Sequence, residues 1–171
     1  PPGISIYYQK QMAHHLLPDM GREWLDGLTH AFLIRDPRPM IASLGEKLAD
    51  FELEATGLPQ QVEIFEHVLA REGRVPPVVD SADLLARPEV TLRALCAALG
   101  VPYSDRMLNW PAGRRATDGI WAKHWYDRVE QSTGFEVPPA EKAIELSPRA
   151  AAIEARCRPL YDRLREHKLR P

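Results

Sequence analysis

The feature that most constrains the fold is the segment THAFLIRDPRPMIAS at residues 29–43, which joins a strand-like run directly to a helix start. Residues 29–34 contain the β-branched and aromatic side chains that favour a strand. Asp36 is a good helix N-cap, and Pro37 suits the first helical position because proline has no amide hydrogen to leave unbonded. The pattern therefore predicts a strand over 29–34 and a helix over 36–49.

Strand-like and helix-like runs alternate along the rest of the chain. Further strands are predicted over 4–9 and 75–79, and the second of these contains two prolines, which is typical of an edge or terminal strand. Periodicity and capping residues predict the remaining helices, over 11–28 with a break at Gly21, 60–71, 89–99, 147–167 and a short one capped by Asp80 and Ser81. This alternation favours an α/β fold, a mostly parallel sheet flanked by helices.

The ends of the predicted strands indicate where a ligand binds. In open parallel sheets, ligands bind beyond the carboxyl ends of the strands. Lys10, Arg35 and Asp80 stand at those ends. We therefore expect these three residues at the ligand-binding edge of the sheet.

Composition and charge exclude several classes of protein. The 171 residues carry 22 Lys+Arg and 24 Asp+Glu, a net charge of −2, so a nucleic-acid partner is not expected. No apolar run approaches the ~20 residues of a membrane span, and a cytoplasmic location is expected. Cys96 and Cys157 lie in helix-like sequence without metal-ligand spacing, so we expect buried or neutral thiols and no metal.

The length fits one domain over 1–171. Because the chain opens with Pro1-Pro2-Gly3 instead of methionine, we expect it to be the C-terminal portion of a longer protein.

Arg35 and Ser43 form the first candidate anion site. An arginine at a strand end can give a bidentate fork to a phosphate, and a hydroxyl eight positions later on the next helix can add a neutral donor. The alternative is that Arg35 pairs with a carboxylate and Ser43 fills a helix-packing position. The sequence by itself leaves both interpretations open.

A second cationic candidate lies in residues 109–125, which combine Gly, Pro, Arg and Trp without any period and predict a long ordered loop. Arg114 and Arg115 follow Gly113, and the backbone amides of such a loop can cradle phosphate oxygens while the arginines neutralise them. The alternative is a solvated arginine pair. Tryptophans 110, 121 and 125 with Tyr126 could line an apolar acceptor pocket or belong to the core.

Together these two segments resemble the superfamily of sulfotransferases that use 3′-phosphoadenosine 5′-phosphosulfate (PAPS), over residues 4–135. In that family a strand-ending Arg and a Ser eight residues later bind the 3′-phosphate, a role that the resemblance implies for Arg35 and Ser43. The resemblance also implies a three-layer architecture of the P-loop type. The predicted last helix has no counterpart in it.

The family's R-K-G-x-x-G-x-W loop returns to the same phosphate, and its counterpart here begins at Arg114 and includes Arg115, Gly119 and Trp121. Arg115 replaces the family's Lys and keeps the charge. Ala116 replaces the first Gly and restricts the backbone of the turn.

The family also places a general-base His in a K-x-H pattern after a strand. Here Lys10 is followed, two or three positions out of register, by His14 and His15. A histidine can take a proton from an acceptor hydroxyl because its pKa lies close to working pH. The resemblance makes Lys10, His14 and His15 the candidate catalytic residues; the alternative is that the histidines are structural or solvated.

The implied function is sulfuryl transfer from PAPS to a hydroxyl or amine on a small-molecule acceptor, by a protein that can be oligomeric. The family's N-terminal loop, which holds the 5′-phosphosulfate, has no counterpart in these residues, so the chain by itself is expected to be inactive. Two alternatives stand beside this function. One is a non-catalytic nucleotide-binding or interaction module, and the other is a small-molecule P-loop kinase, for which no G-x-x-x-x-G-K-[ST] is present.

Overall fold

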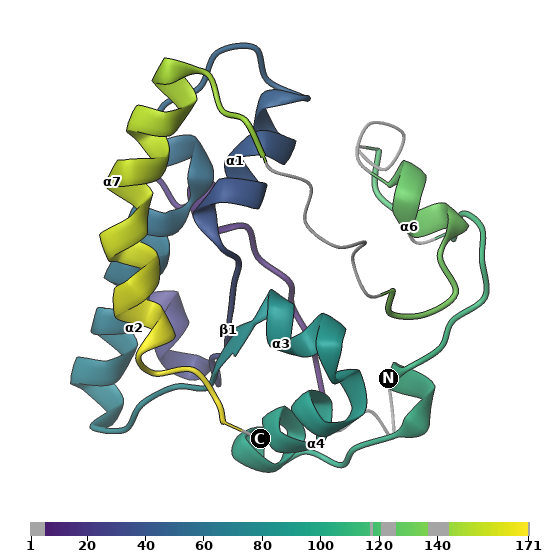
Figure 1. The fold of residues 1–171 in the computed structure, drawn as a ribbon. Helices are drawn as coiled ribbons and strands as arrows, with labels where there is room; N and C mark the ends of the chain where they lie inside the picture. Colours follow the sequence, from purple (N-terminus) through teal and green to yellow (C-terminus); the bar gives the residue numbers. More distant parts are fainter. Residues whose placement is uncertain (1–5, 117, 121–125, 137–143, 171) are drawn as a thin grey trace.

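The computed structural model describes residues 6–116, 118–120, 126–136 and 144–170. Its strands are short, and most of its regular structure is helical (Figure 1). In chain order the elements, with η for a 3₁₀ helix, are η1 (Ala13–His15), η2 (Glu23–Gly27), β1 (Phe32–Ile34), α1 (Pro37–Gly45), η3 (Leu53–Thr56), α2 (Leu58–Glu72), β2 (Val78–Asp80), α3 (Ser81–Ala86), α4 (Pro88–Leu99), η4 (Asp105–Met107), α6 (Asp127–Gln131) and α7 (Pro148–Arg165).

The sheet is small and parallel. β1 pairs with β2 in the register Phe32 to Val78 and Ile34 to Asp80, so the two carboxyl ends lie side by side. Lys168 forms a further parallel bridge to Val78, and the amide of Leu169 donates to the Val78 carbonyl at 2.8 Å. The predictions of an α/β chain and of parallel strands are confirmed.

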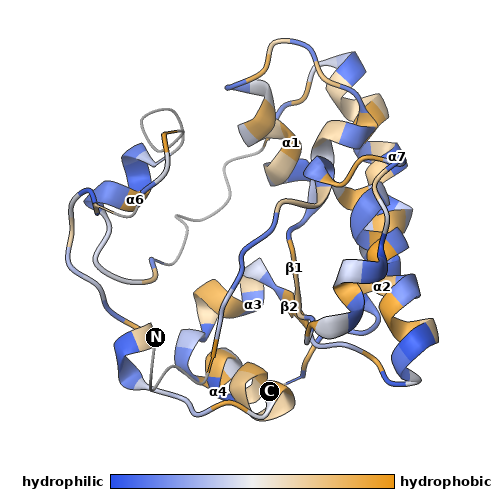
Figure 2. Cartoon of the chain, turned by 180° about the vertical axis from the view of Figure 1, so that it is seen from behind, coloured by the Kyte–Doolittle hydropathy of each residue, from blue (hydrophilic) through white to orange (hydrophobic). Residues whose placement is uncertain are grey.

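The last helix packs against this sheet and against two earlier helices. α7 contacts α1, α2 and both strands, and α2 lies beside it along the same side of the molecule (Figure 1). Figure 2 shows β1 and β2 coloured mostly as hydrophobic, as expected for the centre of the packing. The core side chains come mainly from these five elements and include Ile34, Ile41, Phe65, Val68, Val78, Ile153, Cys157 and Leu164. The expectation that Cys96 and Cys157 are buried is confirmed.

The predicted strand-to-helix unit forms, but both elements are shorter than expected. β1 keeps only the last three residues of the predicted strand, and α1 ends at Gly45 instead of residue 49. The Asp36 carboxylate caps α1 by accepting the Arg38 amide at 2.9 Å. Leu48, which lies within the predicted helix, is 39% exposed because it follows the last turn of α1.

The other helix ends also follow local chemistry. α2 and α4 end at Gly73 and Gly100, both in the left-handed conformation, and Asp80 caps α3. Ser147 caps α7 through its side-chain oxygen, and the predicted last helix is confirmed, although it ends at Arg165. No described helix is both long and apolar enough to cross a membrane.

The first predicted strand is wrong over the described part, residues 6–9, which pair with no described strand. Residues 4 and 5 of that prediction lie outside the described residues. Tyr7 and Tyr8 are 84% and 81% exposed. High β propensity means that a side chain fits a half-buried pleated surface, so it does not form a strand without a neighbour. Lys10 therefore does not stand at a strand end.

The predicted helix over 11–28 is also wrong. Two short 3₁₀ helices, η1 and η2, form instead. Pro18 lacks an amide hydrogen and its ring clashes with a preceding helical turn, and Gly21 weakens any helix through it. The periodic apolar residues consequently separate: Leu16 and Leu25 enter the core, and Met12, Met20 and Trp24 are exposed.

Candidate functional site

The candidate site lies at the carboxyl ends of β1 and β2. Because the strands are parallel and Ile34 pairs with Asp80, the residues that follow both strands emerge at one edge. Arg35 follows β1, and Asp80 is itself the last residue of β2. The sequence prediction that these two residues share an edge is thus met by the register.

Arg35 is exposed at this edge, and its guanidinium makes no hydrogen bond or ion pair with another described residue. Ser43 is exposed on α1, the helix that begins two residues after Arg35. A guanidinium and a hydroxyl that face solvent can each donate a hydrogen bond to a phosphate. The alternative in which Arg35 pairs with a carboxylate is not seen among the described residues.

Asp36, between β1 and α1, joins this edge to the last helix. Arg158 of α7 donates to both carboxylate oxygens of Asp36, at 2.7 and 3.0 Å. The same guanidinium donates to Glu154 one turn earlier, at 2.6 Å from Nη2 and 3.2 Å from Nε. The hydrogen bond from Arg158, opposed by partial burial, lowers the pKa of Asp36, and the two carboxylates raise the pKa of Arg158.

Asp80 is held in a related way. Tyr161, one turn after Arg158 on α7, donates its hydroxyl to Asp80 at 2.6 Å, and Asp80 is only 4% exposed. Burial, and then this hydrogen bond, raise the pKa of the Tyr161 hydroxyl. The phenol therefore stays protonated at neutral pH and remains a donor. Asp80 is thus occupied by structural contacts.

The candidate catalytic histidines lie near the start of α2. A Cβ atom added at Gly57, just before α2, would lie 3.2 Å from the backbone nitrogen of His14, so η1 packs closely against this helix end. One turn into α2, the Gln61 side chain donates to the Leu33 carbonyl of β1 at 3.1 Å. These contacts link η1, the start of α2 and the end of β1.

The protonation of His14 follows from its surroundings. Partial burial, with the nearby charges of His15 and Lys10, lowers the pKa of His14. The His14 and His15 rings stand edge to face at 4.3 Å between centroids. His15 and Lys10 are exposed. The lowered pKa keeps His14 neutral, and so able to accept a proton, at neutral pH.

The cationic loop forms a lobe stabilised by its own contacts. Asn109 bridges to Gly134, the Trp110 indole donates to Ser132 at 3.0 Å, and the Trp110 and Phe135 rings meet edge to face. The Gly113 amide donates to the Glu130 carbonyl at 2.7 Å. The described part of residues 109–125 has no helix or strand, as predicted. Figures 1 and 2 show α6, which belongs to this lobe, apart from α1 and α7.

The candidate residues of this loop are placed as follows. Arg114 and Arg115 are exposed, and the Arg115 amide donates to Asp118 at 2.8 Å, which closes a tight turn. Gly119 is partly buried, and Trp121 lies outside the described residues. No hydrogen bond or ion pair among the described residues joins Arg114 or Arg115 to the edge at Arg35.

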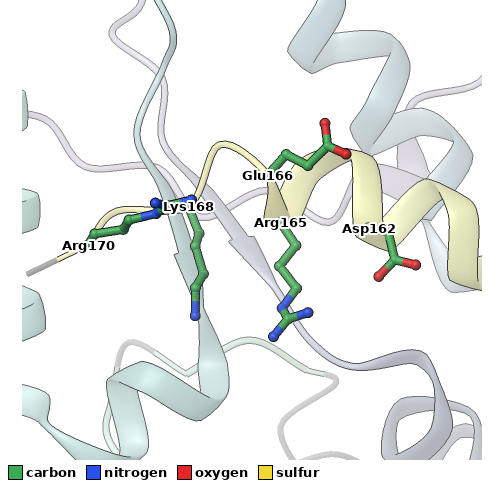
Figure 3. Close-up of a pocket in the computed structure, with 5 residues that line it drawn as sticks. All are labelled: Asp162, Arg165, Glu166, Lys168 and Arg170. Carbon is green, nitrogen blue, oxygen red and sulfur yellow. The ribbon is translucent and has the colours of Figure 1, made fainter.

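An open hollow of about 610 Å³ lies at the C-terminal end of α7. Figure 3 shows the side chains that line it, namely Asp162, Arg165, Glu166, Lys168 and Arg170. Lys168 is already paired there with Asp83 at 2.6 Å. The mixed charges and the open form do not indicate a specific ligand. Among the described residues no group of His, Cys, Asp and Glu is arranged to hold a metal ion.

Sequence reasoning missed Arg158 and Tyr161, which contact both strand ends. Their spacing of three on one helix places them on the same face, and this was visible in the sequence. Nothing local showed that the face would lie against Asp36 and Asp80, which are 122 and 81 residues away from these partners.

Comparison with known proteins shows which family the chain is similar to. The model of the family described as sulfotransferase domain matches residues 2–165, and so includes α7. Two curated proteins of Arabidopsis thaliana are similar: branched-chain-amino-acid aminotransferase-like protein 2, 34% identical over 97% of this chain, and protein 1, 35% identical over 94%.

The chain spans 29% and 28% of the length of these two relatives. No solved structure matches the chain. The family model covers nearly all of the sequence, and the strand-end arginine with the helix after it lies inside the matched part. The chain therefore belongs to the sulfotransferase domain family.

Proposed function

We propose that this chain binds PAPS and takes part in sulfuryl transfer to a hydroxyl or amine of a small-molecule acceptor. The observation that carries the proposal is Arg35, an exposed guanidinium without an ion-pair partner among the described residues, at the carboxyl end of a parallel strand. Membership of the sulfotransferase domain family supports the same chemistry.

The residues that would hold PAPS fit its charge. Arg35 and Ser43 would bind the 3′-phosphate through charged and neutral donors. Arg114, Arg115, Gly119 and Trp121 would contribute a second cationic wall if residues 109–121 approach that edge. When bound, PAPS supplies a sulfuryl group on a phosphate leaving group, and fixed cations stabilise the negative charge that develops on such a group.

The proposed catalytic group is His14, with His15 and Lys10 beside it. Because its pKa is lowered, His14 is neutral at pH 7 and can accept the proton of an acceptor hydroxyl. Lys10 would add positive charge near the reacting groups. The His15 ring meets that of His14 edge to face, and His15 would take the role of base if the acceptor approaches from the exposed side.

The proposal extends to the domain organisation, the architecture and the location of the protein. We propose one domain over residues 1–171, a three-layer architecture of the P-loop type, and a cytoplasmic location. The relatives bear an aminotransferase-like name, but this chain corresponds to less than a third of each.

A second candidate is a non-catalytic nucleotide-binding or interaction module on the same scaffold. The position of the α6 lobe apart from α1 and α7 favours it, because the second cationic segment is then not at the phosphate edge (Figures 1 and 2). Both candidates require Arg35 to bind phosphate. They differ in whether His14 acts as a base that takes a proton from a bound acceptor.

Isothermal titration with adenosine 3′,5′-bisphosphate tests the proposal. Replacing Arg35 by Ala removes a charge-assisted fork, which contributes about 1.5–3 kcal/mol, so we expect about tenfold to hundredfold weaker binding. Arg93→Ala, a change on α4 at a 53% exposed side chain paired with Glu89, is the control and should bind like wild type.

Equal binding by wild type and Arg35→Ala would remove the proposed site. Tighter binding of ATP with Mg²⁺ than of the bisphosphate would favour a kinase instead. A third outcome is that Arg35→Ala weakens binding as expected, but no form of the protein that contains a phosphosulfate loop transfers a sulfuryl group. That outcome would favour the non-catalytic module.

A further inference from the structure

The Asp36 carboxylate accepts two sets of hydrogen bonds near the end of β1. Its carboxylate caps α1 by accepting the Arg38 amide at 2.9 Å, and it accepts the bidentate fork of Arg158 at 2.7 and 3.0 Å. The Arg158 and Asp36 side chains are 35% and 40% exposed, so the pair is only partly screened by water. Asp36 is therefore held both by the first turn of the helix that it caps and by a side chain of α7.

Arg158 is itself held in one orientation. Glu154, 18% exposed and one turn earlier on α7, accepts from Nε and Nη2, which leaves Nη1 and the shared Nη2 directed at Asp36. The guanidinium carbon also lies 5.5 Å from the centroid of the Tyr161 ring. An arginine fixed on two sides loses little additional entropy when it binds a third group. Arg158 is thus a preorganised partner for Asp36.

The position of Asp36 connects its contact with Arg158 to the proposed phosphate site. Arg35 is the residue before it, and Ser43 lies on the helix that it caps. Both proposed phosphate ligands therefore take their place from the backbone on either side of one carboxylate. Small displacements of binding groups reduce affinity steeply because charge-assisted hydrogen bonds depend on distance and angle.

We propose that Arg158 is a positioning residue of the phosphate site: through Asp36 it fixes the end of β1 and the first turn of α1, and so the placement of Arg35 and Ser43. This inference rests on the proposed function above and adds one residue of α7 to those that shape the site. Arg158 itself does not contact the ligand.

Two other contacts of α7 supply matched controls. Arg163 pairs with Glu66 of α2 at 2.7 Å, with side chains 57% and 46% exposed, and does not reach the strand ends. Tyr161 supports the end of β2 through Asp80. Loss of the Tyr161 hydroxyl should destabilise the fold but leave the hydrogen bonds between Arg158 and Asp36 intact.

The test compares the affinity of the full chain for adenosine 3′,5′-bisphosphate in the wild type and four variants. Arg158→Ala should bind about tenfold more weakly, and Arg158→Lys should also lose affinity because an ammonium cannot reproduce the bidentate fork. Arg163→Ala and Tyr161→Phe should bind within about twofold of wild type, the spread expected for uncoupled sites. Tyr161→Phe should nevertheless unfold at a lower urea concentration than wild type.

A double-mutant cycle separates positioning from a general loss of stability. If Arg158 acts through Arg35, the Arg158→Lys change should have much less effect on affinity once Arg35 is Ala. Amide hydrogen exchange gives a readout without ligand: the Arg38 amide should exchange faster in Arg158→Lys than in Arg163→Ala, because its acceptor is no longer held.

The outcomes distinguish the two proposals. If the wild type does not bind the bisphosphate, or Arg35→Ala binds equally well, the proposed function fails and the inference fails with it. If Arg35→Ala weakens binding and both Arg158 variants bind normally, the inference alone is overturned. Should Arg158→Ala not fold, Arg158→Lys carries the comparison because it keeps the charge and the aliphatic stem.

Discussion

At the residue scale, single carboxylates connect local and distant structure in this protein. Asp36 and Asp80 each cap the helix that follows them, and each accepts a hydrogen bond from α7. The caps join residues two apart in the chain, whereas the bonds to α7 span 122 and 81 residues. The first kind of contact shapes an element, and the second fixes where the element lies.

The ionisation of Asp36 should appear in the pH dependence of stability. Its pKa is lowered in the folded state, so the unfolded chain binds more protons in the acidic range. Its contribution is fully present above the ordinary pKa of about 3.9 and is lost as the pH falls through the lowered value. Because the side chain is 40% exposed, we expect only about 1 kcal/mol at pH 7.

Urea unfolding of wild type and Asp36→Asn between pH 7 and pH 2.5 measures this contribution. The free energies of unfolding should differ at neutral pH and converge in acid. Asp50→Asn is the control, since Asp50 is 73% exposed and pairs with Arg149 at the surface. A constant difference between wild type and Asp36→Asn across the pH range would contradict the assignment.

At the element scale, Gly57 lies between η3 and α2 and packs against η1. Its φ of +73° lies in the left-handed region, and the backbone nitrogen of His14 lies 3.2 Å from the position of an added Cβ. Glycine meets both demands, since it has no side chain and tolerates positive φ. The 3₁₀ helix that carries the candidate base therefore packs closely against this glycine.

Gly57→Ala should lower the free energy of unfolding by more than Gly73→Ala does. Gly73 also has a positive φ, +63°, but no atom lies within 4 Å of an added Cβ. The loss of stability in Gly73→Ala thus measures the conformational strain of a side chain at positive φ, about 1–2 kcal/mol. Any additional loss of stability in Gly57→Ala measures the contact with η1. Equal losses in urea unfolding would mean that η1 moves away without cost.

At the scale of the whole molecule, α7 completes the core. It supplies Ile153, Cys157, Tyr161 and Leu164 to the buried cluster and packs on α1, α2 and both strands. The segment after it adds a bridge beside β2. The last helix therefore stabilises elements that precede it by about a hundred residues, and the family match extends over it.

Leu164→Ala should destabilise the entire fold. Leu164 is fully buried at 0% exposure, and removing such a side chain costs about 2–5 kcal/mol. Leu33→Ala, in β1 but 56% exposed, is the control and should cost much less. Near-ultraviolet circular dichroism and far-ultraviolet circular dichroism should follow one shifted urea transition. Loss of helix signal from α7 alone, with the rest unchanged, would contradict this role.

Much of the fold was predictable from the sequence because its causes are local. The caps at Asp36, Asp80 and Ser147 and the glycine ends of α2 and α4 depend on residues a few positions apart. The same local signals failed over residues 6–28. There the apolar pattern was present, but Pro18 broke the helix and no described strand paired with residues 6–9.

The chemistry available to this protein follows from its residues alone: a strand-ending arginine, a capped helix that carries a serine, and motifs that resemble those of sulfotransferases. The folded arrangement was needed to show that Arg35 has no partner among the described residues, that Asp36 is held by Arg158, and that the Arg114 loop belongs to a separate lobe. The physical reason is range: helix caps and turns form within one turn of chain, whereas packing and ion pairs across 122 residues form only when the whole chain is folded.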